Sequence, residues 1–167
     1  MWEIPPRLTL ISQVTTLFRG ATNINLDAKG RLAIPTRYRE ALLRACDGRI
    51  VLTLSPRETC LWMYPLHVWE DIERKLVALP SEDLAAERLR HLLIGYADDC
   101  DMDGSGRLLI KEPLRDQAQI TKNSWLIGQG NKFEIWDDEL WRARRDLWLQ
   151  QNVDELPASE QIRQLSL

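Results

Sequence analysis

Apolar and polar residues alternate along two stretches of the chain in the way that is typical of β-hairpins. Residues 21–26 alternate as one strand, a turn follows at 27–30, and 31–34 returns as a second strand. Residues 96–102 and 107–110 repeat this strand, turn and strand. The pattern therefore predicts one hairpin in each half of the chain.

The elements that follow each hairpin also repeat. For the first half we expect a helix capped by Thr36 and ended at Gly48, strands 50–54 and 61–64, and a helix opened by Pro65. For the second half we expect a helix capped by Ser81 that leads in, a short helix opened by Pro113, strands 124–128 and 132–136, and a helix from Asp138.

The two turns match residue by residue. The sequence LDAKGRLAI of the first turn aligns with MDGSGRLLI of the second, so both share the pattern D-x-x-G-R. Asp27 and Asp103 are expected to accept backbone N–H groups, and Gly30 and Gly106 to supply a positive φ angle, which together make a tight turn. The arginine after each glycine begins the returning strand.

Neither half contains enough apolar strand to close a hydrophobic core alone. With 167 residues, of which 44% are hydrophobic, the chain is long enough for one ordinary domain. We therefore expect the halves to interleave their strands about a pseudo-twofold axis in an α+β unit with flanking helices. Trp69 and Trp141 occupy matched helix positions and are interpreted as packing residues.

The second turn also invites a calcium interpretation, because the segment 99–103, DCDMD, places aspartates on alternate positions before a glycine. An EF-hand loop closes with a glutamate at its twelfth position, which is Ile110 here. The first turn carries Asn23 and Asn25 instead of aspartates. We expect no calcium site, and three scattered cysteines without a CxxC pair indicate no zinc site. No cofactor is expected.

Recognisable catalytic and membrane motifs do not occur in the sequence. His67 and His91 have no nucleophile motif beside them. No apolar run approaches the roughly 18 residues that span a bilayer, and Glu3 with two prolines interrupts the opening segment where a signal peptide needs an apolar core. We expect a cytoplasmic protein that is not an enzyme, with no membrane association and no small-molecule substrate.

Four stretches of the chain resemble the MraZ family, namely FRGATNINLDAKGRLAIPTRYRE, PLHVWEDIERKL, CDMDGSGRLLI and NKFEIW. The resemblance runs from Phe18 to Leu167. It implies tandem AbrB-like swapped-hairpin β-barrel repeats with flanking helices, related by a pseudo-twofold axis within one chain. It also implies a bacterial transcriptional regulator that forms homo-oligomeric rings, associates with the nucleoid, and binds repeated boxes in the promoter of the division and cell-wall gene cluster, usually as a repressor.

The resemblance also divides the chain. The expected parts are an extension outside the family pattern at 1–16, a first AbrB-like repeat at 21–67, connecting helices at 68–95, a second repeat at 96–139, and a C-terminal helix and tail at 140–167. Members of the family normally begin at a Met just before Phe18, where this chain has Leu17. We interpret the extension as the result of an upstream start codon, with Leu17 hiding a non-AUG initiator.

The family's D-x-x-x-R motif falls on Asp27 with Arg31 and on Asp103 with Arg107. We predict that Arg31 and Arg107 project towards double-stranded DNA, where a guanidinium can pair with guanine O6 and N7. The two aspartates are expected to hold the turn and orient the arginine, because a carboxylate near phosphate is repelled. The alternative is an Asp–Arg ion pair that only stabilises the turn.

The local charge fits DNA binding better in the first half than in the second. The net charge is −3, yet 27–50 carries six basic and three acidic residues, whereas 103–122 carries four basic and three acidic residues. The first half is therefore expected to bind phosphate better, with Lys29, Arg37 and Arg39 positioning the DNA backbone.

Two other functions stay open from the sequence. An antitoxin-like swapped-hairpin protein would bind a toxin partner as well as DNA, and the tail from Gln151 could serve as the binding arm or form a short helix. A ring-forming scaffold without DNA activity is the other alternative, which the basic hairpin face argues against.

Overall fold

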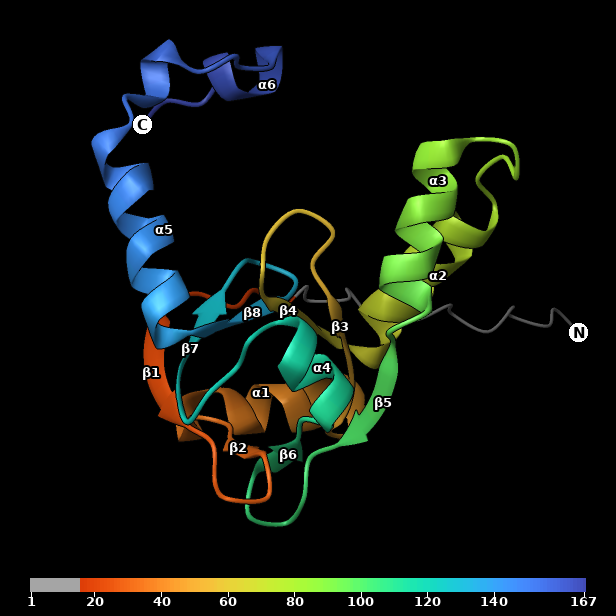
Figure 1. Ribbon diagram of the computed structural model, residues 1–167, viewed down its shortest axis with the longest axis vertical. Helices are drawn as coiled ribbons and strands as arrows, with labels where there is room; N and C mark the ends of the chain where they lie inside the picture. Colours follow the sequence, from red (N-terminus) through yellow and green to blue (C-terminus); the bar gives the residue numbers. More distant parts are fainter. Residues whose placement is uncertain (1–15) are drawn as a thin grey trace, which may run out of the picture.

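The computed structural model describes residues 16–167 (Figure 1). The predicted extension at 1–16, with its start-codon interpretation, lies outside these residues apart from residue 16. The first repeat consists of β1 (Ala21–Asn25), β2 (Arg31–Ala33), α1 (Thr36–Cys46), β3 (Arg49–Leu54), β4 (Leu61–Pro65) and α2 (Leu66–Val77). The segment that leads into the second repeat consists of α3 (Leu84–Leu89) and a π-helical turn (Arg90–Ile94).

The second repeat follows the same order. It consists of β5 (Asp98–Asp101), β6 (Arg107–Leu109), α4 (Glu112–Gln117), β7 (Asn123–Gly128), β8 (Phe133–Asp137) and α5 (Asp138–Gln150). The C-terminal segment forms a 3₁₀ turn (Val153–Glu155) and α6 (Glu160–Arg163). The tail from Gln151 is therefore partly helical, which was one of its two interpretations.

Six strands form one antiparallel sheet in which the strands of the two repeats interleave. The order across the sheet is β1-β7-β8-β4-β3-β5. β1 of the first repeat pairs with β7 of the second, and β5 of the second pairs with β3 of the first. The remaining strands, β2 and β6, pair as a separate two-stranded ribbon. The α+β fold with interleaved tandem repeats is thus confirmed, whereas the exact limits of the repeats stay a prediction.

The pseudo-twofold axis passes through two strand pairs. In the ribbon, Leu32 lies opposite Leu108, and these residues hold the same position in the two aligned turns. In the sheet, Trp62 of β4 lies opposite Glu134 of β8, which are likewise aligned. Each pair therefore joins a residue to its own counterpart, as a twofold relation requires.

One hydrophobic core is shared by the two repeats. Leu32, Leu108, Leu61 and Ile135 have no exposed surface, and they belong to one cluster of buried residues. Phe133 of the second repeat packs against Phe18 of the first, with 4.3 Å between the ring centroids. Since each repeat supplies only part of this cluster, the two fold as one unit.

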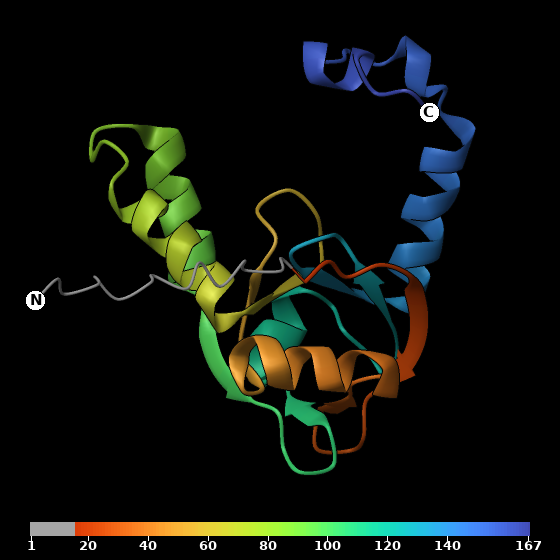
Figure 2. The same cartoon turned by 180° about the vertical axis from the view of Figure 1, so that it is seen from behind.

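Two helical arms project from the sheet on the side opposite the hairpin turns (Figures 1 and 2). α2 and α3 belong to one arm, and Trp69 is buried there at its base. α5 forms the other arm, where Trp141 packs on Trp136 with 5.9 Å between the ring centroids. Both matched tryptophans are packing residues, as expected.

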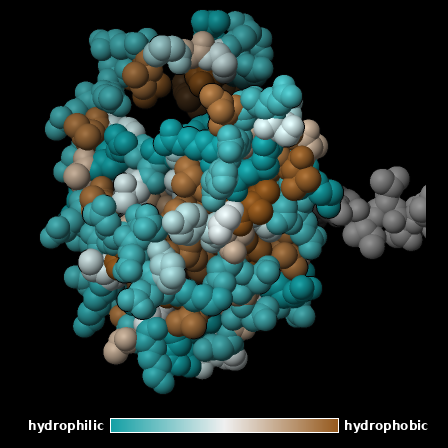
Figure 3. Space-filling view, turned by 45° about the vertical axis from the view of Figure 1, so that its right-hand side comes forward, coloured by the Kyte–Doolittle hydropathy of each residue, from teal (hydrophilic) through white to brown (hydrophobic). Residues whose placement is uncertain are grey.

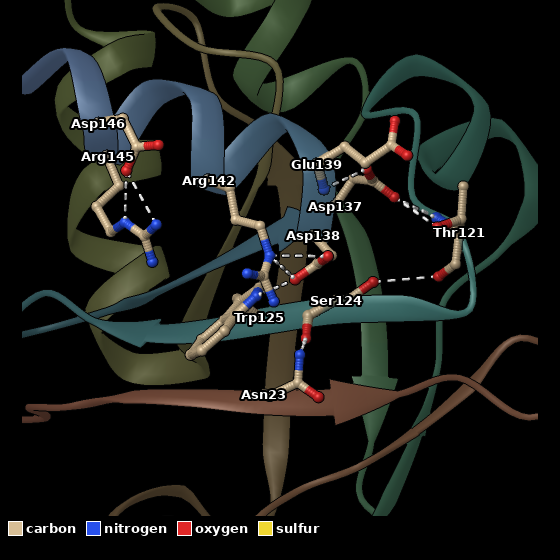
Figure 4. Close-up of polar contacts among 10 residues, drawn as sticks. All are labelled: Asn23, Thr121, Ser124, Trp125, Asp137, Asp138, Glu139, Arg142, Arg145 and Asp146. Atoms are coloured by element: carbon tan, nitrogen blue, oxygen red, sulfur yellow. Dashed lines mark hydrogen bonds and ion pairs between the residues drawn. The ribbon is translucent and has the colours of Figure 1, made fainter.

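Polar contacts fix the start of α5 on the sheet (Figure 4). Asp137, at the N-cap, accepts a hydrogen bond from the backbone N–H of Glu139 at 3.1 Å. Asp138 accepts from Trp125 Nε1 at 2.7 Å and from Arg142 Nε at 2.9 Å. The Trp125 bond and burial of the ring of Trp136 attach the helix to β7 and β8.

Two of the predicted helix caps are wrong. Pro35, with φ −53° and ψ 137°, precedes α1, and Thr36 is its first helical residue with no capping hydrogen bond. Asp83 rather than Ser81 caps α3, because its carboxylate accepts from the N–H groups of Ala85 and Ala86. Helix α1 thus begins one residue earlier than a cap at Thr36 would require. Helix α3 begins two residues later than a cap at Ser81 would require.

The described surface mixes polar and apolar side chains. Within residues 16–167 no helix combines the length and apolar character that crossing a membrane requires. Exposed apolar residues occur along α5 and the C-terminal segment, including Leu147, Leu149, Leu156 and Ile162. In Figure 3 apolar side chains surround a hollow near the top of the view, below the outermost polar cap.

Candidate nucleic-acid interface

The first hairpin turn is held by Asp27. Its backbone N–H donates to the Arg31 carbonyl at 2.9 Å, and the N–H of Gly30 donates to the Asp27 carbonyl at 3.0 Å. The carboxylate Oδ1 accepts from the N–H groups of Lys29 and Arg31, each at 2.9 Å. Oδ2 accepts from Arg31 Nε at 2.6 Å. One aspartate therefore closes the turn and fixes the arginine side chain.

The second hairpin turn repeats these contacts. Asp103 accepts from the N–H groups of Ser105 and Arg107 at 2.9 Å, and from Arg107 Nε at 3.0 Å. The N–H of Gly106 donates to the Asp103 carbonyl at 2.9 Å. The D-x-x-G-R pattern thus encodes the same local structure twice.

Both carboxylates stay ionised at neutral pH. The hydrogen bond from the Arg31 backbone N–H is the main cause that lowers the pKa of Asp27, and its side chain and the Lys29 N–H add to it. The pKa of Asp103 is lowered chiefly by the Arg107 backbone N–H in the same way. Each ion pair is therefore intact at neutral pH.

The outer ends of the two arginines remain available. Their side chains are about one third exposed, 31% for Arg31 and 35% for Arg107. The aspartates engage only the Nε atoms, and within residues 16–167 the terminal amino groups form no hydrogen bond. Each guanidinium is thus oriented on one edge and free to donate from the other.

Each hairpin turn packs against an arginine of the other repeat. Gly30, at φ +81°, lies against Arg115 of α4, and Gly106, at φ +73°, lies against Arg39 of α1. The turns are also joined by backbone hydrogen bonds, from Ile110 N–H to the Gly30 carbonyl at 3.0 Å and from Ile34 N–H to the Gly106 carbonyl at 2.8 Å. The turns lie together at the end of the molecule opposite the arms (Figure 1).

The other predicted phosphate contacts are placed differently from one another. Lys29 is exposed within the first turn. Arg39 Nε donates to the Ile34 carbonyl at 2.7 Å, beside the second turn. Arg37 instead bonds Thr22 on β1 and lies over the ring of Tyr38, at 4.6 Å from its centroid. The structure therefore groups Lys29 and Arg39 with the turns, but gives Arg37 no contact to either one.

Two basic residues beside the first turn were counted in the sequence but not assigned to the site. Arg115 and Lys122 line a pocket that also includes Asp27 and Ala28. Arg115 is the counterpart of Arg39 when the alignment of the two turns is continued along the chain, and no such signal pointed to Lys122. Their proximity to the first turn depends on pairing between the repeats, which the local sequence does not encode.

The calcium interpretation is not supported by the strand geometry. Asp99 and Asp101 belong to β5, where they pair with Val51 and Arg49 of β3. A strand keeps the chain extended, so these carboxylates do not wrap around one point as in an EF-hand loop. Asp103, the third acid, is engaged in its own turn.

The fold and the paired turns define the class of protein first. Interleaved α+β repeats, each carrying an aspartate-oriented arginine on a tight turn, are those of a tandem swapped-hairpin protein. Residues 17–92 and 93–161 each match the family described as "MraZ protein, putative antitoxin-like". The chain belongs to this MraZ family, and the resemblance seen in the sequence is confirmed.

Several curated relatives are similar over most of the chain. A protein of Halorhodospira halophila is 54% identical over 135 residues, covering 81% of this chain and 89% of the relative. Those of Thioalkalivibrio sulfidiphilus and Yersinia pseudotuberculosis are 46% and 48% identical, covering 90% of this chain and the whole of each relative. All three are named "Transcriptional regulator MraZ". The expectation that the chain is not an enzyme is thereby confirmed.

Proposed function

We propose that this protein is a DNA-binding transcriptional regulator that reads double-stranded promoter DNA with Arg31 and Arg107. The observation that carries the proposal is the repeated geometry of the two turns, in which an aspartate holds Nε and leaves the terminal amino groups free. A guanidinium oriented in this way can donate two hydrogen bonds to guanine O6 and N7, which discriminates between bases by about 1–3 kcal/mol. The names of the relatives support the same function.

The roles of the neighbouring residues follow from their positions. Lys29 on the first turn, and Arg39 beside the second, are suited to phosphate contacts that set the register of the protein on the duplex. Arg37 would contribute only where DNA extends beyond the turns towards β1. Asp27 and Asp103 act indirectly, because they orient the arginines and do not favour a nearby phosphate.

The proposed assembly is a homo-oligomeric ring. One chain presents few positive charges within a net charge of −3, so a single subunit should bind weakly. Neighbouring subunits of a ring would engage successive promoter boxes at a high effective concentration, which strengthens binding without new contacts. The proposed target is the promoter of the division and cell-wall gene cluster, which the protein would repress. We place the protein in the cytoplasm, associated with the nucleoid.

Fluorescence anisotropy tests this proposal. Promoter DNA that carries the repeated boxes is compared with scrambled DNA across a salt series, for wild type and an Arg31→Ala/Arg107→Ala variant. A matched control, Arg57→Ala/Arg88→Ala, removes the same charge from exposed positions away from the turns. We expect wild type and control to prefer the boxes and to weaken steeply with salt, and the double variant to lose the preference while still assembling.

Other results would contradict the proposal. If the double variant kept the box preference, the Asp–Arg pairs would serve only to stabilise the turns. If wild type bound neither DNA, the scaffold function would replace it.

A second candidate function is toxin binding, which the words "putative antitoxin-like" in the family description suggest. The C-terminal segment offers exposed apolar side chains for a partner, including Leu156 and Ile162. Purification from native cells tests it: a small protein that co-purifies with the full chain and is lost with an Leu156→Ser/Ile162→Ser variant would support toxin binding, and its absence from the wild-type preparation would contradict it.

A further inference from the structure

A pocket of about 380 Å³ lies beside the first hairpin turn. One wall is formed by Leu26, Asp27 and Ala28, which lead into that turn. The opposite wall comes from the second repeat and includes Arg115, Ile120 and Lys122. The pocket therefore adjoins the turn that carries Arg31.

Arg115 is the unusual side chain of this pocket. Its Nε atom is buried and has no hydrogen-bond partner within residues 16–167. No ion pair of its guanidinium occurs among the same residues. Nε is enclosed against Gly30, whereas Arg115 as a whole is only part-buried. An anion from outside the chain would therefore be attracted to a guanidinium whose charge is not neutralised by an ion pair among these residues.

The aligned position in the other repeat is different. Arg39 also lies against the glycine of the opposite turn, but its Nε donates to the Ile34 carbonyl at 2.7 Å. An arginine can therefore pack against the glycine of the opposite turn and still have a hydrogen-bond partner for Nε, as Arg39 does.

Lys122 adds a second cation that the other repeat lacks. The Lys122 carbonyl accepts from the N–H of Leu26, and the Gly48 carbonyl accepts from the N–H of Met102, both at 2.9 Å. Lys122 and Gly48 thus hold equivalent positions. At Gly48 there is no side chain, and Met102 packs against that position. Among residues 16–167, the position equivalent to Lys122 beside the second turn therefore carries no cation.

The walls of the pocket are held in place. Thr121 donates to Asp137 Oδ1 from its hydroxyl at 2.6 Å and from its backbone N–H at 3.2 Å (Figure 4). Ile120 N–H donates to the Arg115 carbonyl at 2.8 Å. A ligand would therefore meet cations whose backbone positions are already fixed.

The lining indicates the chemistry of the ligand. Arg115 and Lys122 suit an anion with several acceptor oxygens, and Leu26, Ala28 and Ile120 offer apolar surface for a carbon skeleton next to it. Asp27 is the one acid, and its charge is balanced by Arg31. A sugar-phosphate unit fits this combination of cations and apolar wall.

We propose that this pocket takes a phosphate of the DNA backbone, bound by Arg115 and Lys122, when the first turn engages DNA. The inference rests on the proposed function and deepens it. It adds two residues of the second repeat to the phosphate contacts made beside the first turn. Cations from both halves of the chain would then hold the DNA backbone while Arg31 contacts a base.

The test is a salt series of fluorescence anisotropy on boxed and scrambled DNA with Arg115→Gln and Lys122→Gln. The slope of log K against log salt is negative, and each lost phosphate contact should reduce its magnitude by about 0.9 for duplex DNA. The reduction should be the same on both DNAs, because a phosphate contact carries no base specificity. Arg88→Gln, on an exposed position of α3, is the matched control and should keep the wild-type slope.

A second variant separates charge from folding. Arg115→Lys keeps the positive charge and should keep the slope, whereas a structural role for Arg115 alone would alter both variants alike. Thermal unfolding by circular dichroism identifies any variant that has lost its fold. Wild-type slopes in both Arg115→Gln and Lys122→Gln would overturn the inference.

The source of the phosphate is tested without DNA. Calorimetry with inorganic phosphate should give little heat. A free phosphate makes only the contacts of this pocket, whereas DNA also binds the turns. Tight phosphate binding that Arg115→Gln removes, with an unchanged DNA slope, would assign the pocket to a soluble ligand and overturn the DNA assignment. The proposed function fails separately, if wild type binds neither DNA.

Discussion

The two hairpin turns are alike in backbone and unlike in surroundings. Both have an aspartate that accepts the same backbone N–H groups and the following arginine Nε. Around the first turn lie Lys29 and, from the second repeat, Arg115 and Lys122. Around the second lie Arg39 of the first repeat, Ser105, and the exposed acids Asp99 and Asp101 of β5.

This difference separates what folding requires from what binding uses. The hydrogen bonds of the turn recur because the ribbon of β2 and β6 needs both turns in the same conformation. The charges can differ at positions such as Lys29, Asp99 and Asp101, because these side chains are exposed. We therefore expect the two turns to contribute equally to stability and unequally to DNA affinity, and the following substitutions test each half of that statement.

The largest effect is expected at the centre of the ribbon. Leu32→Ala and Leu108→Ala each remove a fully buried side chain and should lower the free energy of unfolding by about 2–5 kcal/mol. Urea denaturation measures the loss, with Leu84→Ala at a largely exposed position of α3 as the control. A clear inequality between the two core variants would argue against the twofold sharing of the core.

A smaller loss is expected from the glycines of the turns. Gly30→Ala and Gly106→Ala force a positive φ on alanine and bring its Cβ to 2.9 Å and 2.2 Å from Arg115 and Arg39 atoms. Each should destabilise the protein by about 1–3 kcal/mol. Gly104→Ala is the control, because nothing lies within 4 Å of its Cβ position, and thermal unfolding compares all three. Equal melting temperatures would show that the turns tolerate side chains.

A further effect is expected in acid. The pKa values of Asp27 and Asp103 lie below their usual 3.8, so their ionised forms stabilise the fold above that pH. This stability is lost as the pH falls through the lowered pKa of the folded state. In urea denaturation between pH 5 and pH 2, Asp27→Asn/Asp103→Asn should show a weaker loss of stability below pH 3.8 than wild type. An unchanged pH profile would mean that other carboxylates dominate.

The smallest effect is expected from the acids beside the second turn. Asp99→Asn/Asp101→Asn copies the asparagines of the first repeat and removes two negative charges near the proposed DNA surface. DNA affinity at low salt should rise about two- to tenfold and the gain should fade as salt screens the charges. The control Asp154→Asn/Glu155→Gln makes the same charge change in the C-terminal segment. An equal gain in the control would assign the effect to net charge alone.

Local chemistry explains which features could be predicted from the sequence. The turns were predictable because the D-x-x-G-R pattern contains the aspartate, glycine and arginine that close them. The interleaving of the strands was predictable because neither half could bury its apolar strands alone. The cap at Ser81 was wrong because Asp83, two residues later, accepts the N–H groups of α3. The pocket at Arg115 was not predictable, since it exists only where α4 of one repeat meets Gly30 of the other.

The most direct test of the account compares Arg31→Ala with Arg107→Ala one at a time, by fluorescence anisotropy on boxed and scrambled DNA at matched salt. We expect both single variants to assemble and both to lose part of the box preference. The greater loss of affinity is expected in Arg31→Ala, because more of the proposed phosphate contacts lie beside the first turn than beside the second. Equal and unchanged preference in both variants would contradict the claim that these turns read DNA, and a greater loss in Arg107→Ala would contradict the asymmetry between them.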